Sequence, residues 1–186
     1  SEAERIVEEL RKLIEDLRRK NEEVKERLKR LVREDEKRNE EVLKELEDRA
    51  DELRKLVEKL SDKDTLKKIL ERAREEIKRL VKEIREENKR SVEKIEELLK
   101  RARDTNETIL RRIEEEVRKA EKDLKDDKDV VDRLRRVIED LKRTVEKSNE
   151  DSDRVIKEVK KRIDDSLKRV EDVIRRVKET IDRLEK

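Results

Sequence analysis

Small polar side chains interrupt an apolar pattern in the segment KSNEDSDRVI, residues 147–156. Ser148, Asn149 and Ser152 lie where helical periodicity requires a core residue. Their hydroxyl and amide groups could support nucleophilic catalysis by a serine, or they could exchange buried hydrogen bonds. A nucleophilic serine needs a general base, and the sequence has no His and no well-placed core Lys. We therefore predict hydrogen bonding here and no catalytic residue.

Other charged clusters predict no metal, cofactor or nucleic-acid site. The run KDDKD at 125–129 lacks the Gly, the twelve-residue loop and the bidentate Glu of an EF-hand, so helix capping explains it better. Glu-rich helices can hold two metal ions, but those sites use Glu-x-x-His and this sequence has no His. Basic runs such as RLKRLVR at 27–33 alternate with Glu at helical spacing and lack aromatic residues, which is typical of solvated faces.

The composition places the chain among long amphipathic helices. Its 186 residues include 58 basic and 56 acidic ones, and Gly, Pro, Cys, Met and aromatic residues are absent. So many charges usually indicate disorder, but here the signs nearly cancel and apolar residues recur regularly. No apolar run could span a membrane, and SEAERIVEEL is acidic where a signal peptide would be basic. We expect a soluble chain without a membrane partner or localisation signal, suited to recombinant expression in the cytoplasm.

The helical pattern breaks at two places, LSDKDTL and LKDDKDVV. Both contain Asp-Lys-Asp just before an apolar residue, and an Asp side chain is a good N-cap because it accepts hydrogen bonds from free first-turn amides. The sequence therefore predicts N-caps near Asp62 and Asp127. Ser1 and Glu4 have the spacing of a capping box at the first helix.

Between these breaks the pattern predicts three helices, at about residues 2–60, 63–125 and 128–185. The apolar residues of each helix fill one arc, and the rest of its surface is charged. Connections this short return each helix antiparallel to the one before it. We predict an all-α fold: a single-chain, antiparallel, up-down-up three-helix bundle that forms one elongated domain over residues 1–186.

The period of the apolar residues predicts how the helices wind. From Ile6 to Leu60 they recur about every 3.6 residues, the period of a straight helix, whereas a heptad coiled coil has about 3.5. The pattern repeats after eighteen residues, as at Ile77, Ile95 and Ile113. We therefore expect a nearly untwisted bundle, whose handedness the pattern does not define.

Polar residues inside the apolar arcs follow the same repeat, since Asn21 precedes Asn39 by eighteen residues and Asn88 precedes Asn106 by eighteen. With turns near residues 62 and 127, facing residues have numbers that add to about 125 in the first hairpin and about 254 in the second. The register predicts two transverse polar layers: Asn21, Asn106, Ser148, Asn149 and Ser152 in one, and Asn39, Asn88, Ser91 and Ser166 in the other. They would lie about 27 Å apart.

Two further polar residues, Asp35 and Thr105, are candidates for these layers. Asp35 lies at the register of Leu17, so it either accepts hydrogen bonds from the second layer or turns toward water. Thr105 and Ser166 lie near the edges of their arcs, where partial solvation is an alternative. A buried amide without a partner costs about 1–3 kcal/mol, so layers of this kind would penalise every register that separates them.

The composition and the polar layers resemble computationally designed helical bundles with buried hydrogen-bond networks. The resemblance covers the whole chain: a charged surface, a core of Leu, Ile and Val with Asn and Ser layers, and no Gly, Pro, Met, His or aromatic residue. Natural three-helix modules such as spectrin-like repeats carry aromatic residues and shorter helices. The resemblance implies a structural scaffold without an evolved activity, a rigid, very stable, monomeric rod that needs no cofactor and no partner.

A second function stays open beside the scaffold. Bundles of this class can also be built as interaction, assembly or switch modules that exchange a helix with a helical partner or form homo-oligomers. The segment 128–185 is the candidate for exchange, because it is rich in Val and carries four of the polar core residues. A helix in the same chain has an effective concentration of about millimolar, which any competitor must overcome.

Overall fold

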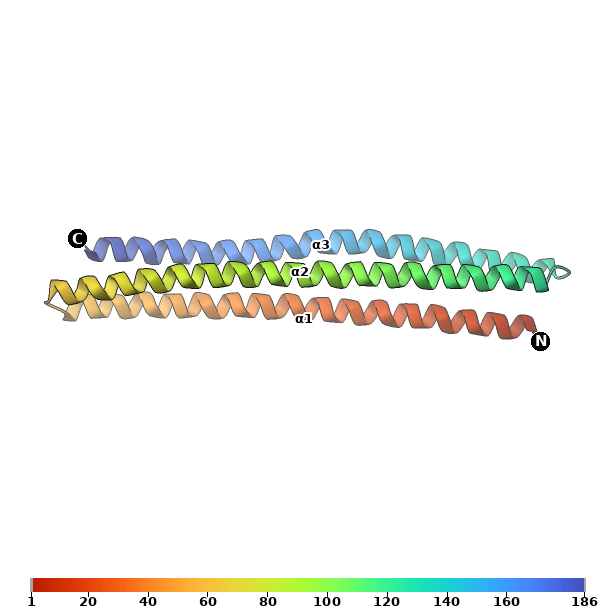
Figure 1. The fold of residues 1–186 in the computed structure, drawn as a ribbon, viewed down its shortest axis with the longest axis horizontal. Coiled ribbons are helices and arrows are strands. Elements are labelled where there is room, and N and C mark those ends of the chain that lie inside the picture. Colours follow the sequence, from red (N-terminus) through yellow and green to blue (C-terminus); the bar gives the residue numbers. More distant parts are fainter. Residues whose placement is uncertain (1, 186) are drawn as a thin grey trace. The chain divides into compact units, whose positions relative to one another are not determined.

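The computed structural model describes residues 2–185, and these form three long helices. They are α1 (Glu2–Lys59), α2 (Lys63–Asp123) and α3 (Lys128–Glu185), drawn in Figure 1. No strand occurs among the described residues, and the three helices pack against one another, so the predicted all-α three-helix bundle is confirmed. The absence of twist stays a prediction.

The helices α2 and α3 begin where the capping residues predict. The backbone carbonyl oxygens of Asp62 and Asp127 accept the first helical bonds of α2 and α3, from Leu66 and Val131. Asp62 also accepts side-chain bonds from the Thr65 hydroxyl at 2.8 Å and the Asp64 amide at 3.1 Å, and these bonds lower the pKa of Asp62. The proposed capping box involves Ser1, which lies outside the described residues.

The helix α2 ends two residues earlier than predicted. The Asp127 amide donates to the carbonyl oxygen of Leu124 at 2.9 Å, which closes a tight turn in place of a further helical turn. Both connections are short, so each helix is followed at once by an antiparallel neighbour.

The chain divides into two compact units, and each contains a segment of every helix. Unit 1 comprises Ser1–Lys29 and Ile95–Lys157, and unit 2 comprises Arg30–Lys94 and Glu158–Lys186. Within each unit, three helical segments form a bundle of their own. The expectation of a single domain over residues 1–186 stays a prediction.

Each unit has an apolar core to which all three helices contribute. In unit 2 the buried members are Leu46, Ala50, Leu53, Leu70, Ala73, Ile77, Ile84, Val170, Ile174, Val177 and Ile181. In unit 1 they are Leu10, Leu17, Ile113, Val117, Ala120, Leu134, Leu141 and Val145. Burying a Leu, Ile or Val side chain contributes about 1.5–3 kcal/mol, so these clusters hold the helical segments together.

Ion pairs between α1 and α2 of unit 2 reveal the register of these helices. Arg38 pairs with Glu87, and Arg49 pairs with Glu76. The two residue numbers add to 125 in each pair, which is the register that the position of the first turn predicts.

Ion pairs between α2 and α3 lie in a slightly different register. The residue numbers add to 256 in Arg103–Asp153 of unit 1 and in Arg85–Glu171 of unit 2, two more than the predicted 254. Two residues correspond to about 3 Å along a helix, so the difference is less than one turn.

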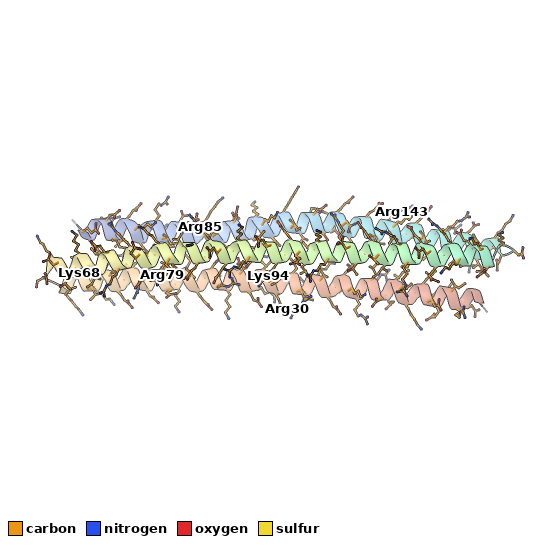
Figure 2. The ribbon with its side chains drawn as sticks, viewed as in Figure 1. Arg30, Lys68, Arg79, Arg85, Lys94 and Arg143 are labelled. Atoms are coloured by element: carbon orange, nitrogen blue, oxygen red, sulfur yellow. The ribbon has the colours of Figure 1, made fainter. Side chains whose placement is uncertain are left out.

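The outer surface of the helices is charged. Figure 2 labels Arg30, Lys68, Arg79, Arg85, Lys94 and Arg143, and the structure exposes all six. Many surface charges form pairs three or four residues apart on one helix, such as Arg101 with Glu97 at 2.7 Å. Exposed pairs of this kind contribute about 0.3–0.5 kcal/mol each, so the cores and not the surface charges stabilise the bundle.

Replacing Leu70 with Ala should lower the free energy of unfolding by about 2–5 kcal/mol, because a fully buried side chain leaves a cavity. Leu70 is 0% exposed, whereas Leu56 on α1 is 41% exposed and supplies the matched control. Leu56→Ala should change the stability by less than about 0.5 kcal/mol. Guanidinium unfolding followed by circular dichroism measures both, and equal losses would contradict the assignment of Leu70 to the core.

Candidate functional site

The structure buries six polar side chains in the part of the chain that it describes: Asp35, Asn39, Asn88, Ser91, Asn106 and Ser166. Five of them belong to unit 2, and Asn106 belongs to unit 1. All lie at positions that the sequence assigns to the polar layers, Asp35 as a candidate. Buried polar groups need internal hydrogen-bond partners, so these residues are the natural place to look for a specific site.

One hydrogen-bonded network joins the three helices of unit 2. Asn39 of α1 donates from Nδ2 to Asn88 Oδ1 at 3.0 Å and to Ser166 Oγ at 2.9 Å. Asn88 of α2 donates from Nδ2 to Asn39 Oδ1 at 3.2 Å and to the backbone oxygen of Ile84 at 2.6 Å. Ser166 lies on α3, so the network contains one side chain from every helix.

The two amides of this network are fully satisfied. An amide nitrogen carries two hydrogens, and Nδ2 of Asn39 and Nδ2 of Asn88 each have two acceptors. Each amide oxygen accepts a bond from the other amide. Asn39 is 1% exposed and Asn88 is 3% exposed, so bulk water offers no substitute if these partners are lost.

Large apolar side chains cover this network on one side. Ile84 precedes Asn88 by one turn on α2, and Val170 follows Ser166 by one turn on α3. Ile84 is 2% exposed and Val170 is 0% exposed, and both belong to the apolar core of unit 2. The network therefore lies directly against the buried apolar core of unit 2.

Asp35 lies one turn before Asn39 on α1 and is 1% exposed. Its Oδ2 atom has no hydrogen-bond partner among the described residues. Burial raises the pKa of the Asp35 carboxyl, and a hydrogen bond with the Ser91 hydroxyl opposes part of that increase. The structure thus brings Asp35 and Ser91 together beside the network.

The layer predicted for unit 1 has a different geometry. Asn106 is buried, and the other predicted members are partly exposed: Asn21, Ser148, Asn149, Ser152 and, at the edge, Thr105. Ser152 Oγ donates to the backbone oxygen of Ser148 at 2.9 Å, and Arg103 donates to the backbone oxygen of Asn149 at 3.3 Å. Within residues 2–185, no hydrogen bond joins the side chains of different helices in this layer.

The two layers have equivalent Asn and Ser residues at their centres but differ in the residues one turn away that cover them. A shift of eighteen residues along each helix relates Asn39, Asn88 and Ser166 to Asn21, Asn106 and Ser148. The same shift replaces Ile84 by Ala102 and Val170 by Ser152, and both replacements are small and partly exposed. Asn21 and Ser148 are partly exposed beside these smaller side chains, so solvent competes there with internal hydrogen-bond partners.

The rest of the described surface is charged and carries open grooves. No group of three or more His, Cys, Asp or Glu side chains suits a metal ion among the described residues. A groove of about 330 Å³ lies between α1 and α2 in unit 2, with Leu46 and Ile77 in its lining and the Arg49–Glu76 ion pair across it. None of the helices, over their described length, is apolar enough to cross a lipid bilayer.

No family model matches the chain, and no curated protein matches it. Among solved structures, the chain is similar to one described as "Computationally designed three helix bundle". The two chains are 22% identical, and the match covers 98% of this chain and 83% of the other with a TM-score of 0.37. At this TM-score, the fold assignment rests on the helices and contacts described above.

Replacing Asn39 with Ala should lower the free energy of unfolding by about 1–3 kcal/mol, because it removes both bonds between Asn39 and Asn88 and the donor to Ser166 in a buried site, while Asn88 keeps only its bond to the Ile84 backbone oxygen. Asn106→Ala is the matched control, since Asn106 is buried to the same degree as Asn88 but has no partner on another helix. Its effect should be clearly smaller. Denaturant unfolding measures the free energy of unfolding of both variants. A larger loss of stability in Asn106→Ala than in Asn39→Ala would contradict the assigned hydrogen bonds.

Proposed function

We propose that the chain is a structural scaffold, without catalytic activity, whose helix register is specified by buried polar side chains. The observation that supports this most strongly is the network of Asn39, Asn88 and Ser166, which takes one residue from each helix. Apolar layers tolerate a slip of one helix against another, whereas a network with paired donors and acceptors does not.

The cost of a slip follows from the network's composition. If α2 moved by one turn, Ile84 or Val92 would face Asn39 in place of Asn88. Asn39 and Asn88 would then lose the two hydrogen bonds between their side chains, at about 1–3 kcal/mol for each buried group left unpaired. The observed register would therefore have a lower free energy than a register in which α2 is shifted by one turn.

The likeness in composition to designed bundles supports the same function. A charged surface without Gly, Pro or aromatic residues is suited to a stiff, very stable and monomeric element that serves as a spacer or a fusion arm. No partner, cofactor or substrate is needed for that role.

A second candidate function is an assembly or switch module that exchanges α3. The observation that favours it is the polar layer of unit 1, where the side chains of Ser148, Asn149 and Ser152 of α3 are partly exposed and, within the described residues, make no hydrogen bond to another helix. A free peptide of residues 128–185 tests it directly: stable binding of this peptide to the full chain at micromolar concentration would favour exchange, and no binding would favour the scaffold.

Replacing Asn39 and Asn88 with Leu and Ser166 with Val in one variant should keep or raise the melting temperature, because apolar side chains then fill the site. The same variant should lose its uniform oligomeric state, because nothing in the layer now opposes slipped or exchanged helices. Native mass spectrometry and calorimetry measure the two properties.

The matched control is the variant Asn21→Leu, Asn106→Leu and Asn149→Leu in the layer of unit 1, which should disturb uniformity less. A unit 2 variant that stays uniformly monomeric and equally well ordered would contradict the proposed role of the network in specifying the register.

A further inference from the structure

Asp35 is a buried acid without the partners that a buried charge requires. Its side chain is 1% exposed, and its Oδ2 atom has no hydrogen-bond partner among the described residues. Transferring an ionised carboxylate into such a site is costly unless donors or a cation accompany it, so the neutral acid is favoured there.

The amide donors closest along the helices are already in use. Both hydrogens of Asn39 Nδ2 and both hydrogens of Asn88 Nδ2 have acceptors elsewhere. The Ser91 hydroxyl is the donor that remains for Asp35, and one hydroxyl serves only one carboxylate oxygen. The network that satisfies the amides therefore leaves the acid short of donors.

The charged groups around Asp35 come from all three helices and largely cancel one another. On its own helix lie Glu36 and Arg38, and α2 contributes Glu87. Arg38 pairs with Glu87 at 3.5 Å, and Arg162 of α3 pairs with Glu36 at 2.7 Å. Arg38 favours a negative charge at Asp35, whereas Glu36 and Glu87 oppose it. Each of the two cations also has an acidic partner of its own.

We propose that Asp35 is a proton-binding site that makes unit 2 pH-sensitive: the three helical segments pack tightly around the neutral acid, and ionisation of Asp35 loosens them. The sequence supports this with a built-in comparison, because Leu17 occupies the position of Asp35 one repeat earlier and is 1% exposed in unit 1. An apolar side chain fits this register, and the charged form of Asp35 does not.

The direction of the pH effect follows from the raised pKa. An unfolded Asp has a pKa of 3.8, and the folded pKa of Asp35 lies above that value. The stability contributed by protonated Asp35 is fully present below 3.8 and is lost as the pH rises through the folded pKa. Between the two pKa values, the folding constant should fall about tenfold per pH unit relative to a chain that cannot ionise here.

Carboxyl ¹³C NMR of the full chain measures the protonation of Asp35 directly. A titration from about pH 3 to about pH 9 should place the midpoint of Asp35 clearly above 3.8, the value of an unfolded Asp. A midpoint at or below 3.8 would overturn the proposal, and this measurement needs no variant to fold.

Unfolding in guanidinium over the same pH range measures the coupling to stability. The ratio of the wild-type folding constant to that of Asp35→Asn should fall with rising pH up to the measured midpoint and stay level above it. Asp48→Asn, an exposed position on α1, is the control and should show no such change. A ratio for Asp35→Asn that does not vary with pH would overturn the proposal, as would the same variation in Asp48→Asn.

Discussion

Buried amide hydrogens must find acceptors inside the protein, and in our proposal this constraint makes one arrangement of the three helices of unit 2 better than its neighbours. Leu, Ile and Val layers supply most of the stabilisation, but they resemble one another from turn to turn. Asn39 and Asn88 have four amide hydrogens between them, and all four reach acceptors only when α1, α2 and α3 are in the observed register.

The polar layers of the two units have the same three side-chain types at equivalent repeat positions but differ in their hydrogen bonds. Asn21, Asn106 and Ser148 repeat the pattern of the unit 2 network, yet Asn21 and Ser148 are partly exposed. The difference lies in the neighbours, because Ala102 and Ser152 cover less surface than Ile84 and Val170. The unit 2 network thus differs from the unit 1 layer on the side of Ile84 and Val170, where large buried apolar residues cover it.

Much of the fold could be predicted from periodicity and capping. The apolar arcs and the Asp62 and Asp127 caps define three helices and their order, and the turn positions define the α1–α2 register. Periodicity places Asp35 at a core position but could not decide between burial and rotation toward water, because that choice depends on the packing of all three helices. The sequence of α1 alone also does not show why Asn39 is buried and Asn21 is partly exposed, since this difference depends on neighbouring residues of α2 and α3.

Hydrogen exchange of side-chain amides tests the central claim most directly. In the full chain, the Nδ2 hydrogens of Asn39 and Asn88 should exchange far more slowly than those of Asn21, because both amides lie in a dry, fully bonded site. NMR of the Asn side-chain signals after transfer into heavy water measures these rates. Exchange of Asn39 and Asn88 at the rate of Asn21 would mean that the network is open to water, and it would contradict the account.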